Sequence, residues 1–173
     1  MTSRPDQNQC FIALGSNLGD RHAHIRAAVE ALARLPGTDV VRVSTIIETE
    51  PVGPAGQERY LNGVAQIRTS LGPRDLLSHL LRMELERGRD RASSPRWGSR
   101  TLDLDLLLFG DRVIDEPGLS VPHPRLRERL FVLEPLAEIA PELALPPDGK
   151  RVREALDLLR RGTAGASVRR TNG

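Results

Sequence analysis

Residues 102–109 constrain the fold of this chain more than any other segment. They form a leucine-rich run interrupted by Asp103 and Asp105. Side chains alternate between the two faces of a strand, and same-face neighbours lie roughly 6–7 Å apart. A strand here therefore puts both aspartates on one face and the alternate leucines on the other. Carboxylates in the middle of a strand are costly unless something compensates their charge. We predict a strand with one buried apolar face and one functional face.

The paired aspartates predict a site for a hard cation. Oxygen ligands without sulfur favour Mg²⁺ or Mn²⁺. Four arginines also lie close before this strand in the sequence: Arg89, Arg91, Arg96 and Arg100. Carboxylates that hold a metal, beside guanidinium groups that hold phosphate, indicate chemistry on a nucleoside triphosphate. The alternative is a solvated strand face or turn, because Asp-x-Asp is a common sequence.

The length and charge of the chain limit the number of domains and the kinds of partner that we expect. With 173 residues, we expect one folded domain over residues 1–161. Residues 162–173 are small and polar, which predicts a disordered tail. The net charge of +2, from 25 basic and 23 acidic residues, gives no reason to expect a nucleic-acid partner.

The location of the protein is predicted from what the sequence lacks. Cys10 is the single cysteine, so neither a disulfide framework nor a thiolate metal site is expected. The first residues are polar and carry no apolar signal segment. No segment approaches the length of a membrane span. We therefore predict a cytoplasmic protein with no membrane partner. We also expect a monomer, although none of these features bears on the oligomeric state.

The periodicity of the chain predicts an α+β fold. Apolar and β-branched patterns indicate strands at 10–14, 40–49, 60–69 and 102–109, and helices at 21–35 and 73–88. The order βαββαβ is that of a ferredoxin-like sandwich, an antiparallel sheet with two helices packed on one face. Shorter elements are predicted after it: a strand at 113–114, helical turns at 125–130, an apolar packing segment at 132–140 and a helix at 152–161. This fold serves many functions, so it does not identify one.

Several motifs follow one another along the chain in an order that is more specific than any one of them. They are Ala13–Gly19 (ALGSNLG), Glu50–Pro54 (EPVGP), Tyr60–Gly63 (YLNG), Glu84–Arg89 (ELERGR), Arg96–Gly98 (RWG), Arg100–Asp105 (RTLDLD) and Val121–Pro124 (VPHP). From about residue 11 to about 146, this series resembles the 6-hydroxymethyl-7,8-dihydropterin pyrophosphokinases of folate biosynthesis.

The resemblance implies a reaction and its co-substrate. Diphosphate would pass from ATP to the hydroxymethyl group of the reduced pterin, and AMP would be released. Asp103 and Asp105 match the pair that holds two Mg²⁺ ions in this family. Arg89, Arg91 and Arg100 match catalytic arginines that also bind ATP, on or near a mobile loop.

The resemblance also implies the remaining binding residues. On the pterin side these are Thr49, Pro51, Val52, Tyr60, Asn62, Trp97 and Phe131. On the ATP side, besides the three arginines, these are Glu84, Leu106, Leu119, His123 and Arg129. Without the family, core packing is the better explanation of Phe131, and a solvated helix face is the better explanation of Glu84. For His123 the alternative is an ordinary turn residue between prolines.

Three other functions are compatible with part of the pattern. An Asp-x-Asp glycosyltransferase would need a larger domain than 173 residues comfortably provide. A ferredoxin-like RNA binder would need exposed aromatic residues on its central strands, where this chain has two aspartates. A catalytically inactive homologue would lack ligands, whereas the candidate set here is complete.

Overall fold

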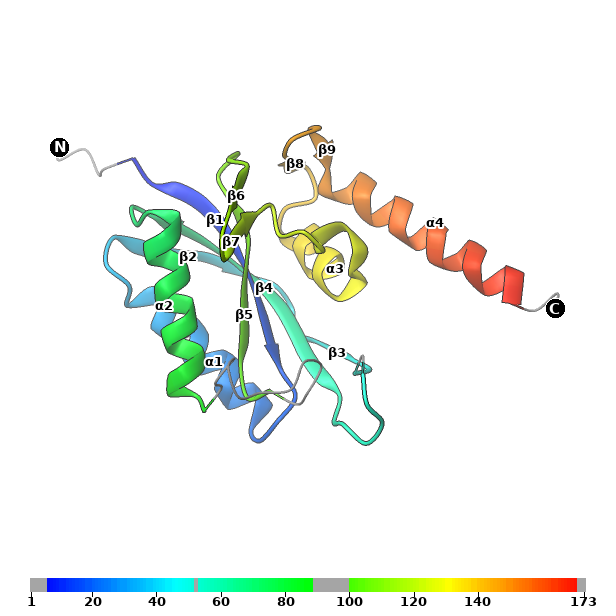
Figure 1. The fold of residues 1–173 in the computed structure, drawn as a ribbon, viewed down its shortest axis with the longest axis horizontal. Coiled ribbons are helices and arrows are strands. Elements are labelled where there is room, and N and C mark those ends of the chain that lie inside the picture. Colours follow the sequence, from blue (N-terminus) through cyan, green and yellow to red (C-terminus); the bar gives the residue numbers. More distant parts are fainter. Residues whose placement is uncertain (1–5, 52, 89–99, 171–173) are drawn as a thin grey trace.

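The protein is described by a computed structural model that covers residues 6–51, 53–88 and 100–170, with side chains up to residue 163. Its centre is a five-stranded sheet in which the paired strands run antiparallel (Figure 1). The strands are β1 (Asn8–Ser16), β2 (Thr38–Val43), β3 (Ile47–Thr49), β4 (Tyr60–Thr69) and β5 (Asp103–Phe109). The order is β2-β4-β1-β5, and β3 pairs with β4. This architecture confirms the predicted α+β fold with an antiparallel sheet.

Two helices cover one face of the sheet, as the sequence predicts. They are α1 (Arg21–Ala33) and α2 (Pro73–Glu86). Asp20 caps α1 by accepting the Ala23 N–H at 3.0 Å, and Pro73 occupies the first turn of α2, where no intrahelical N–H is needed. Their apolar stripes pack on a core that includes Ile12, Leu104 and Leu106.

The opposite face of the sheet is covered too, which the sequence did not predict. The turn η1 (Leu126–Glu128) leads into α3 (Leu130–Ile139), which lies on β4, and α4 (Val152–Arg170) packs on α3 (Figure 1). This second core contains Phe11, Val64 and Leu107. Two hairpins complete the fold: β6 (Ile114–Glu116) with β7 (Leu119–Val121), and β8 (Ala144–Leu145) with β9 (Lys150–Arg151).

The prediction of one continuous strand at 40–49 is wrong, because the structure divides this segment into β2 and β3. At the break, Ser44 Oγ accepts the Val64 N–H at 2.9 Å, and the N–H and hydroxyl of Thr45 both donate to Glu138 of α3. A Cβ added to Gly63 would lie only 2.5 Å from Ile46 Cδ1, so the glycine lets the Ile46 side chain approach β4. These contacts come from distant segments, and no local pattern encodes them.

The C-terminal helix also differs from the sequence prediction. α4 continues through Gly162 to Arg170, beyond the helix predicted at 152–161. The disordered tail predicted for residues 162–173 stays a prediction. Among the described residues, no helix combines the length and apolar character that crossing a membrane requires.

Candidate active site

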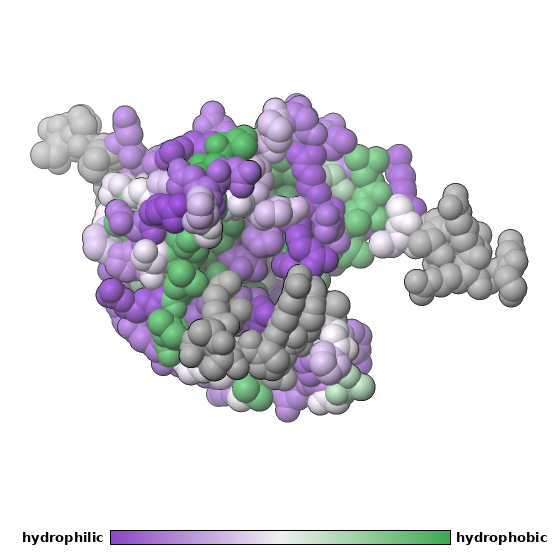
Figure 2. Space-filling model, viewed as in Figure 1, coloured by the Kyte–Doolittle hydropathy of each residue, from purple (hydrophilic) through white to green (hydrophobic). Residues whose placement is uncertain are grey.

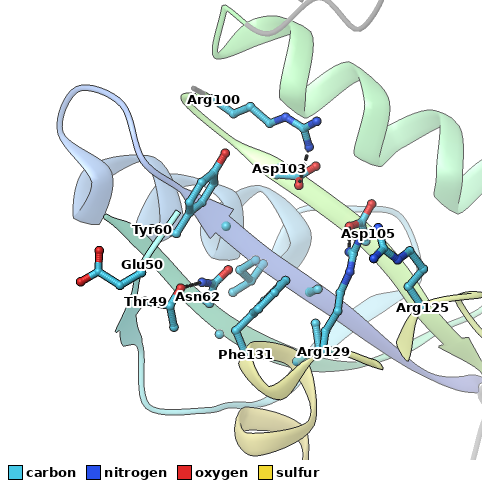
Figure 3. Close-up of a pocket in the computed structure, with 15 residues that line it drawn as sticks. Thr49, Glu50, Tyr60, Asn62, Arg100, Asp103, Asp105, Arg125, Arg129 and Phe131 are labelled. Carbon is cyan, nitrogen blue, oxygen red and sulfur yellow. Dashed lines mark hydrogen bonds and ion pairs between the residues drawn. The ribbon is translucent and has the colours of Figure 1, made fainter. Parts of the chain in front are cut away.

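A cavity of about 280 Å³ lies over the face of the sheet that also carries α3 (Figure 3). Strands β1, β4 and β5, the end of β3 and the start of α3 form its walls. Its lining residues are Ala13, Leu14, Gly15, Thr49, Glu50, Tyr60, Asn62, Gly63, Arg100, Asp103, Asp105, Arg125, Arg129, Phe131 and Val132. Eight of the predicted site residues are therefore brought together from four separate segments.

The register of the sheet creates a row of residues across the cavity floor. Gly15 of β1 is paired with Asn62 of β4 on one side and with Asp103 of β5 on the other. A Cβ built on Gly15 would lie 3.4 Å from Asn62 Oδ1 and 3.6 Å from the Asp103 Cβ. The predicted pterin-binding amide and the first predicted metal ligand are thus separated by a residue with no side chain.

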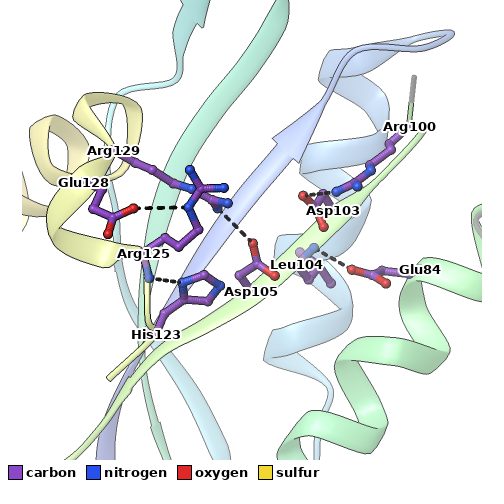
Figure 4. Close-up of polar contacts among 9 residues, drawn as sticks. All are labelled: Glu84, Arg100, Asp103, Leu104, Asp105, His123, Arg125, Glu128 and Arg129. Carbon is purple, nitrogen blue, oxygen red and sulfur yellow. Dashed lines mark hydrogen bonds and ion pairs between the residues drawn. The ribbon is translucent and has the colours of Figure 1, made fainter. Parts of the chain in front are cut away.

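The two aspartates of β5 share the cavity face, as the alternation of the strand predicts. Each lies beside an arginine: Arg100 Nη1 is 3.0 Å from Asp103 Oδ2, and Arg129 Nη1 is 3.9 Å from Asp105 Oδ2 (Figure 4). All four side chains are only 20–23% exposed. Partial burial strengthens charge interactions here relative to the open surface.

The charge balance around Asp105 affects the neighbouring Arg129. Burial lowers the pKa of the Arg129 guanidinium, Asp105 acts in the opposite direction, and the positive charge of Arg125 lowers the pKa further. The Arg129 Cζ also lies 5.6 Å from the ring centroid of Phe131, within the range of a cation–π contact. Arg129 therefore connects the carboxylate end of the cavity with its aromatic wall.

The other end of the cavity is built around the Asn62 amide (Figure 3). Asn62 is buried, and its Nδ2 donates to Thr49 Oγ1 at 2.6 Å. That bond fixes the orientation of the amide. A side-chain amide offers both donor and acceptor groups, which suits the edge of a planar heterocycle. Tyr60 and Phe131 supply aromatic surface at the same end.

Arg100 is held in place through Asn17, a buried residue that directly follows β1. The Arg100 N–H donates to Asn17 Oδ1 at 2.7 Å, and the Asn17 N–H donates to the Arg100 carbonyl at 3.0 Å. Asn17 Nδ2 also donates to Gln57 and to the Glu58 carbonyl. One amide therefore connects the segment that carries Arg100 with the loop that precedes Tyr60.

Some predicted site residues lie outside this cavity. Leu106 and Leu119 are buried in the core beneath α1 and α2. Glu84 of α2 is buried as well, and its carboxylate accepts the Leu104 N–H at 2.8 Å on the opposite side of β5 (Figure 4). Pro51 is half-buried and does not line the cavity. Val52, Arg89, Arg91 and Trp97 fall outside the described residues.

His123 lies next to the carboxylate end, on the segment after β7 (Figure 4). Its N–H donates to the Leu107 carbonyl at 2.8 Å, and its Nδ1 accepts the Arg125 N–H at 3.1 Å. A neutral imidazole whose Nδ1 accepts a hydrogen bond carries its proton on Nε2. An N–H group at Nε2 is suited to a phosphate oxygen.

The donor set fits Mg²⁺ that arrives with a nucleotide. Asp103 and Asp105 supply oxygen ligands on one face, and among the described residues no group of three His, Cys, Asp or Glu side chains could hold a metal. Mg²⁺ is commonly bound by one or two carboxylates together with substrate phosphates and waters, rather than by a cage made wholly of protein. Two carboxylates in an open cavity match that arrangement.

The sequence did not single out several residues that line the cavity. Gly15 and Gly63 lie within recognised motifs, but nothing local shows that Gly15 faces the ligands. Arg125 directly follows the Val-Pro-His-Pro motif. That position is the only feature of the sequence that could have indicated a place in the site. Glu50 follows Thr49 and forms an exposed ion pair with Arg59 at 2.8 Å.

Comparison with known proteins identifies the family. The model of the 7,8-dihydro-6-hydroxymethylpterin-pyrophosphokinase family matches residues 11–141. The chain belongs to this family.

Curated members of the pyrophosphokinase family are similar along most of their length. The enzyme named 2-amino-4-hydroxy-6-hydroxymethyldihydropteridine pyrophosphokinase from Pseudomonas aeruginosa is 51% identical over 146 residues, which cover 84% of this chain and 88% of that protein. The protein of the same name from Bacillus subtilis is 49% identical over 136 residues, 79% of this chain and 80% of that protein.

Solved structures agree with the family assignment at the level of the fold. A crystal structure described as HPPK-DHPS in complex with substrates superposes with a TM-score of 0.70 at 13% identity and covers 91% of this chain. The match covers 44% of that chain, so this chain spans less than half of its length. Plasmodium falciparum HPPK-DHPS with pterin and p-hydroxybenzoate gives a TM-score of 0.67 at 14% identity, over 91% of this chain and 42% of that one.

Proposed function

We propose that this protein transfers diphosphate from ATP to the hydroxymethyl group of 6-hydroxymethyl-7,8-dihydropterin, as a step of folate biosynthesis. The observation that carries the proposal is the row Asn62–Gly15–Asp103 in a single cavity, within a chain of the pyrophosphokinase family. This row sets an amide suited to a pterin edge beside carboxylates suited to a metal–nucleotide complex.

The pterin binds at the Asn62 end in this proposal. The Asn62 amide reads the pyrimidine edge, and its bond to Thr49 fixes the amide before the ligand arrives. Tyr60 and Phe131 pack against the ring system, because aromatic side chains favour offset stacking on planar heterocycles. Pro51, Val52 and Trp97 remain predicted contacts on this side.

The triphosphate binds at the Asp103 and Asp105 end. Both carboxylates would hold Mg²⁺, with two ions expected, and the metal would supply charge neutralisation of the phosphate oxygens. Arg100 and Arg129 already lie beside these carboxylates and present forked donors to phosphate. Arg89, Arg91 and His123 are further proposed phosphate contacts. Glu84, Leu106 and Leu119 remain predicted contacts near the nucleotide.

The chemical step follows from the positions of the two ligands. The pterin hydroxyl oxygen attacks the β-phosphorus of ATP, and the bond from that phosphorus to the oxygen bridging to the α-phosphorus breaks. AMP leaves with the bridging oxygen, and the hydroxyl proton passes to solvent or to Asp105. Arginines in a partly buried cavity stabilise the charge that develops on the transferred group without having to reorganise.

The proposal is tested by product analysis. The protein is incubated with ATP, Mg²⁺ and 6-hydroxymethyl-7,8-dihydropterin, and the nucleotide products are separated. We expect AMP that depends on the pterin, on Mg²⁺ and on Asp103, with no AMP formed by Asp103→Ala. ADP as the product would indicate a simple kinase and would contradict the proposal. Pterin binding without turnover would favour an inactive homologue.

The assembly and location of the protein stay predictions. We propose a monomer in the cytoplasm that acts on small molecules, with neither nucleic acid nor membrane as a partner. Size-exclusion chromatography with light scattering would test the monomeric state. A mass about twice that of the 19.1 kDa chain would contradict it.

A further inference from the structure

We propose that Arg125 is a further phosphate-binding residue of the site and contacts the triphosphate chain of the nucleotide. This inference rests on the proposed function, because it assumes that the nucleotide binds beside Asp105. Nothing in the sequence assigned a role to Arg125. Its position in the cavity wall, its fixed backbone and the local charge balance carry the inference.

Arg125 reaches the cavity from a segment that is firmly held. It lines the cavity together with Asp105 and Arg129, and its side chain lies on the same side of β5 as Asp105 (Figure 4). Its backbone N–H donates to His123 Nδ1 at 3.1 Å, and the His123 N–H is bonded to Leu107 of β5. The backbone of Arg125 is thus tied to the strand that carries the aspartates.

The charges around Asp105 favour an added anion. Arg125 and Arg129 both line the cavity with Asp105, and Arg129 Nη1 lies 3.9 Å from Asp105 Oδ2, so two guanidinium groups share the wall beside this carboxylate. Asp103 of the same strand already forms an ion pair with Arg100. A phosphate group between Arg125 and Arg129 would accept hydrogen bonds from both guanidinium groups.

The contact that Arg125 makes with Glu128 does not oppose this role. Arg125 Nε lies 3.2 Å from Glu128 Oε2, and the two side chains are 46% and 63% exposed. Exposed ion pairs contribute little to stability, because water and salt screen them. A guanidinium has five N–H donors in a planar fork, which matches phosphate geometry. The guanidinium can therefore exchange a carboxylate for phosphate oxygens at small cost.

The test compares two nucleotides and two arginines. Arg125→Ala is titrated, in the full-length protein with Mg²⁺, with α,β-methylene-ATP and separately with AMP. We expect affinity for the triphosphate analogue to fall by about tenfold, the loss of one charged hydrogen bond, and affinity for AMP to change by less than about twofold. The matched control is Arg127→Ala, an arginine two positions later that pairs with Asp148 and does not line the cavity.

The outcomes separate this inference from the proposed function. Equal triphosphate affinity in Arg125→Ala and Arg127→Ala would overturn the role of Arg125 while wild-type AMP formation still supported the function. An equal loss for AMP and for the analogue would also overturn it, because the residue would then contact the nucleoside end or act through the fold. Arg125→Lys keeps the charge and provides a second variant if Arg125→Ala unfolds. We expect it to bind the analogue with intermediate affinity.

Discussion

The carboxylates on the two sides of β5 have different roles. On the cavity face, Asp103 and Asp105 lie next to arginines in a space open to ligands. On the other face, the leucines of β5 pack beneath α2. The Glu84 carboxylate of that helix accepts a hydrogen bond from the Leu104 N–H. On the outer surface drawn in Figure 2, apolar residues gather beside strongly hydrophilic ones. A buried carboxylate with a backbone partner is part of the fold, whereas a carboxylate that faces a cavity beside cations is available for chemistry.

The largest expected effect is on the cavity face, at Asp105. Asp105→Asn keeps the shape of the side chain but removes the charge that would hold Mg²⁺. We expect kcat to fall by about a thousandfold or more, with pterin affinity and the melting temperature close to those of the wild type. Steady-state kinetics, pterin titration and thermal melting measure the three quantities. A loss of pterin affinity equal to the loss of rate would show that the two ends of the cavity are not separate.

The next largest effect on activity is expected at Gly15, on the cavity floor between the pterin end and the carboxylate end. Gly15 has no positive φ, and its added Cβ would meet neighbours only at ordinary contact distances, so the fold accepts Gly15→Ala. Replacing a strand glycine by alanine should stabilise the chain by roughly 0.5–1 kcal/mol. The methyl group would nevertheless occupy the gap between Asn62 and Asp103, and we expect kcat/KM for the pterin to fall by about a hundredfold.

Gly72→Ala provides the matched control for that prediction. Gly72 precedes α2 without a positive φ, and its added Cβ would meet only Asp75 Oδ2 at 4.0 Å. The Gly72→Ala variant should leave kcat/KM for the pterin unchanged. If Gly15→Ala were as active as Gly72→Ala, the row across the floor would not be where the two substrates meet.

A smaller effect is expected on the packed face, at Glu84. Glu84→Ala leaves the buried Leu104 N–H without this acceptor, which should lower the free energy of unfolding by about 1–3 kcal/mol. Urea unfolding measures that change. ATP affinity, measured well below the unfolding midpoint, tests the family-based role of Glu84. Weaker ATP binding at an unchanged free energy of unfolding would show that Glu84 contributes to nucleotide binding and not to the packing of the fold.

The smallest effect is expected on stability, at the Arg127–Asp148 pair, which lies away from both faces of β5. The hydrogen bond from Arg127 lowers the pKa of the Asp148 carboxyl below its ordinary value of 3.8. A lowered folded-state pKa stabilises the fold above the ordinary pKa, and this contribution disappears as the pH falls through the lowered value. The small stability difference between the wild type and Arg127→Gln should therefore be constant from pH 7 to pH 5 and narrow below pH 4. Urea midpoints across this range test it, and a difference that grew in acid would contradict it.

Much of the fold could be predicted because its signals are local. The periodicity of residues 60–69 matches β4 at both ends, and Gly72-Pro73 marks the start of α2. The division at residues 44–46 and the packing of α3 on the second face depend on contacts between distant segments, such as Thr45 with Glu138. The periodicity of the sequence likewise predicted a helix only at 152–161, whereas α4 extends to Arg170.

The sequence by itself determined the alternation of β5, and with it the common face of Asp103 and Asp105, because side-chain direction follows residue number along a strand. Its ordered motifs also determined the family. Only the tertiary structure decided that Gly15 separates Asn62 from Asp103, that Arg125 joins the cavity and that Glu84 faces away from it. These facts depend on the register and packing of segments far apart in the chain, which are set by the energy of the whole fold.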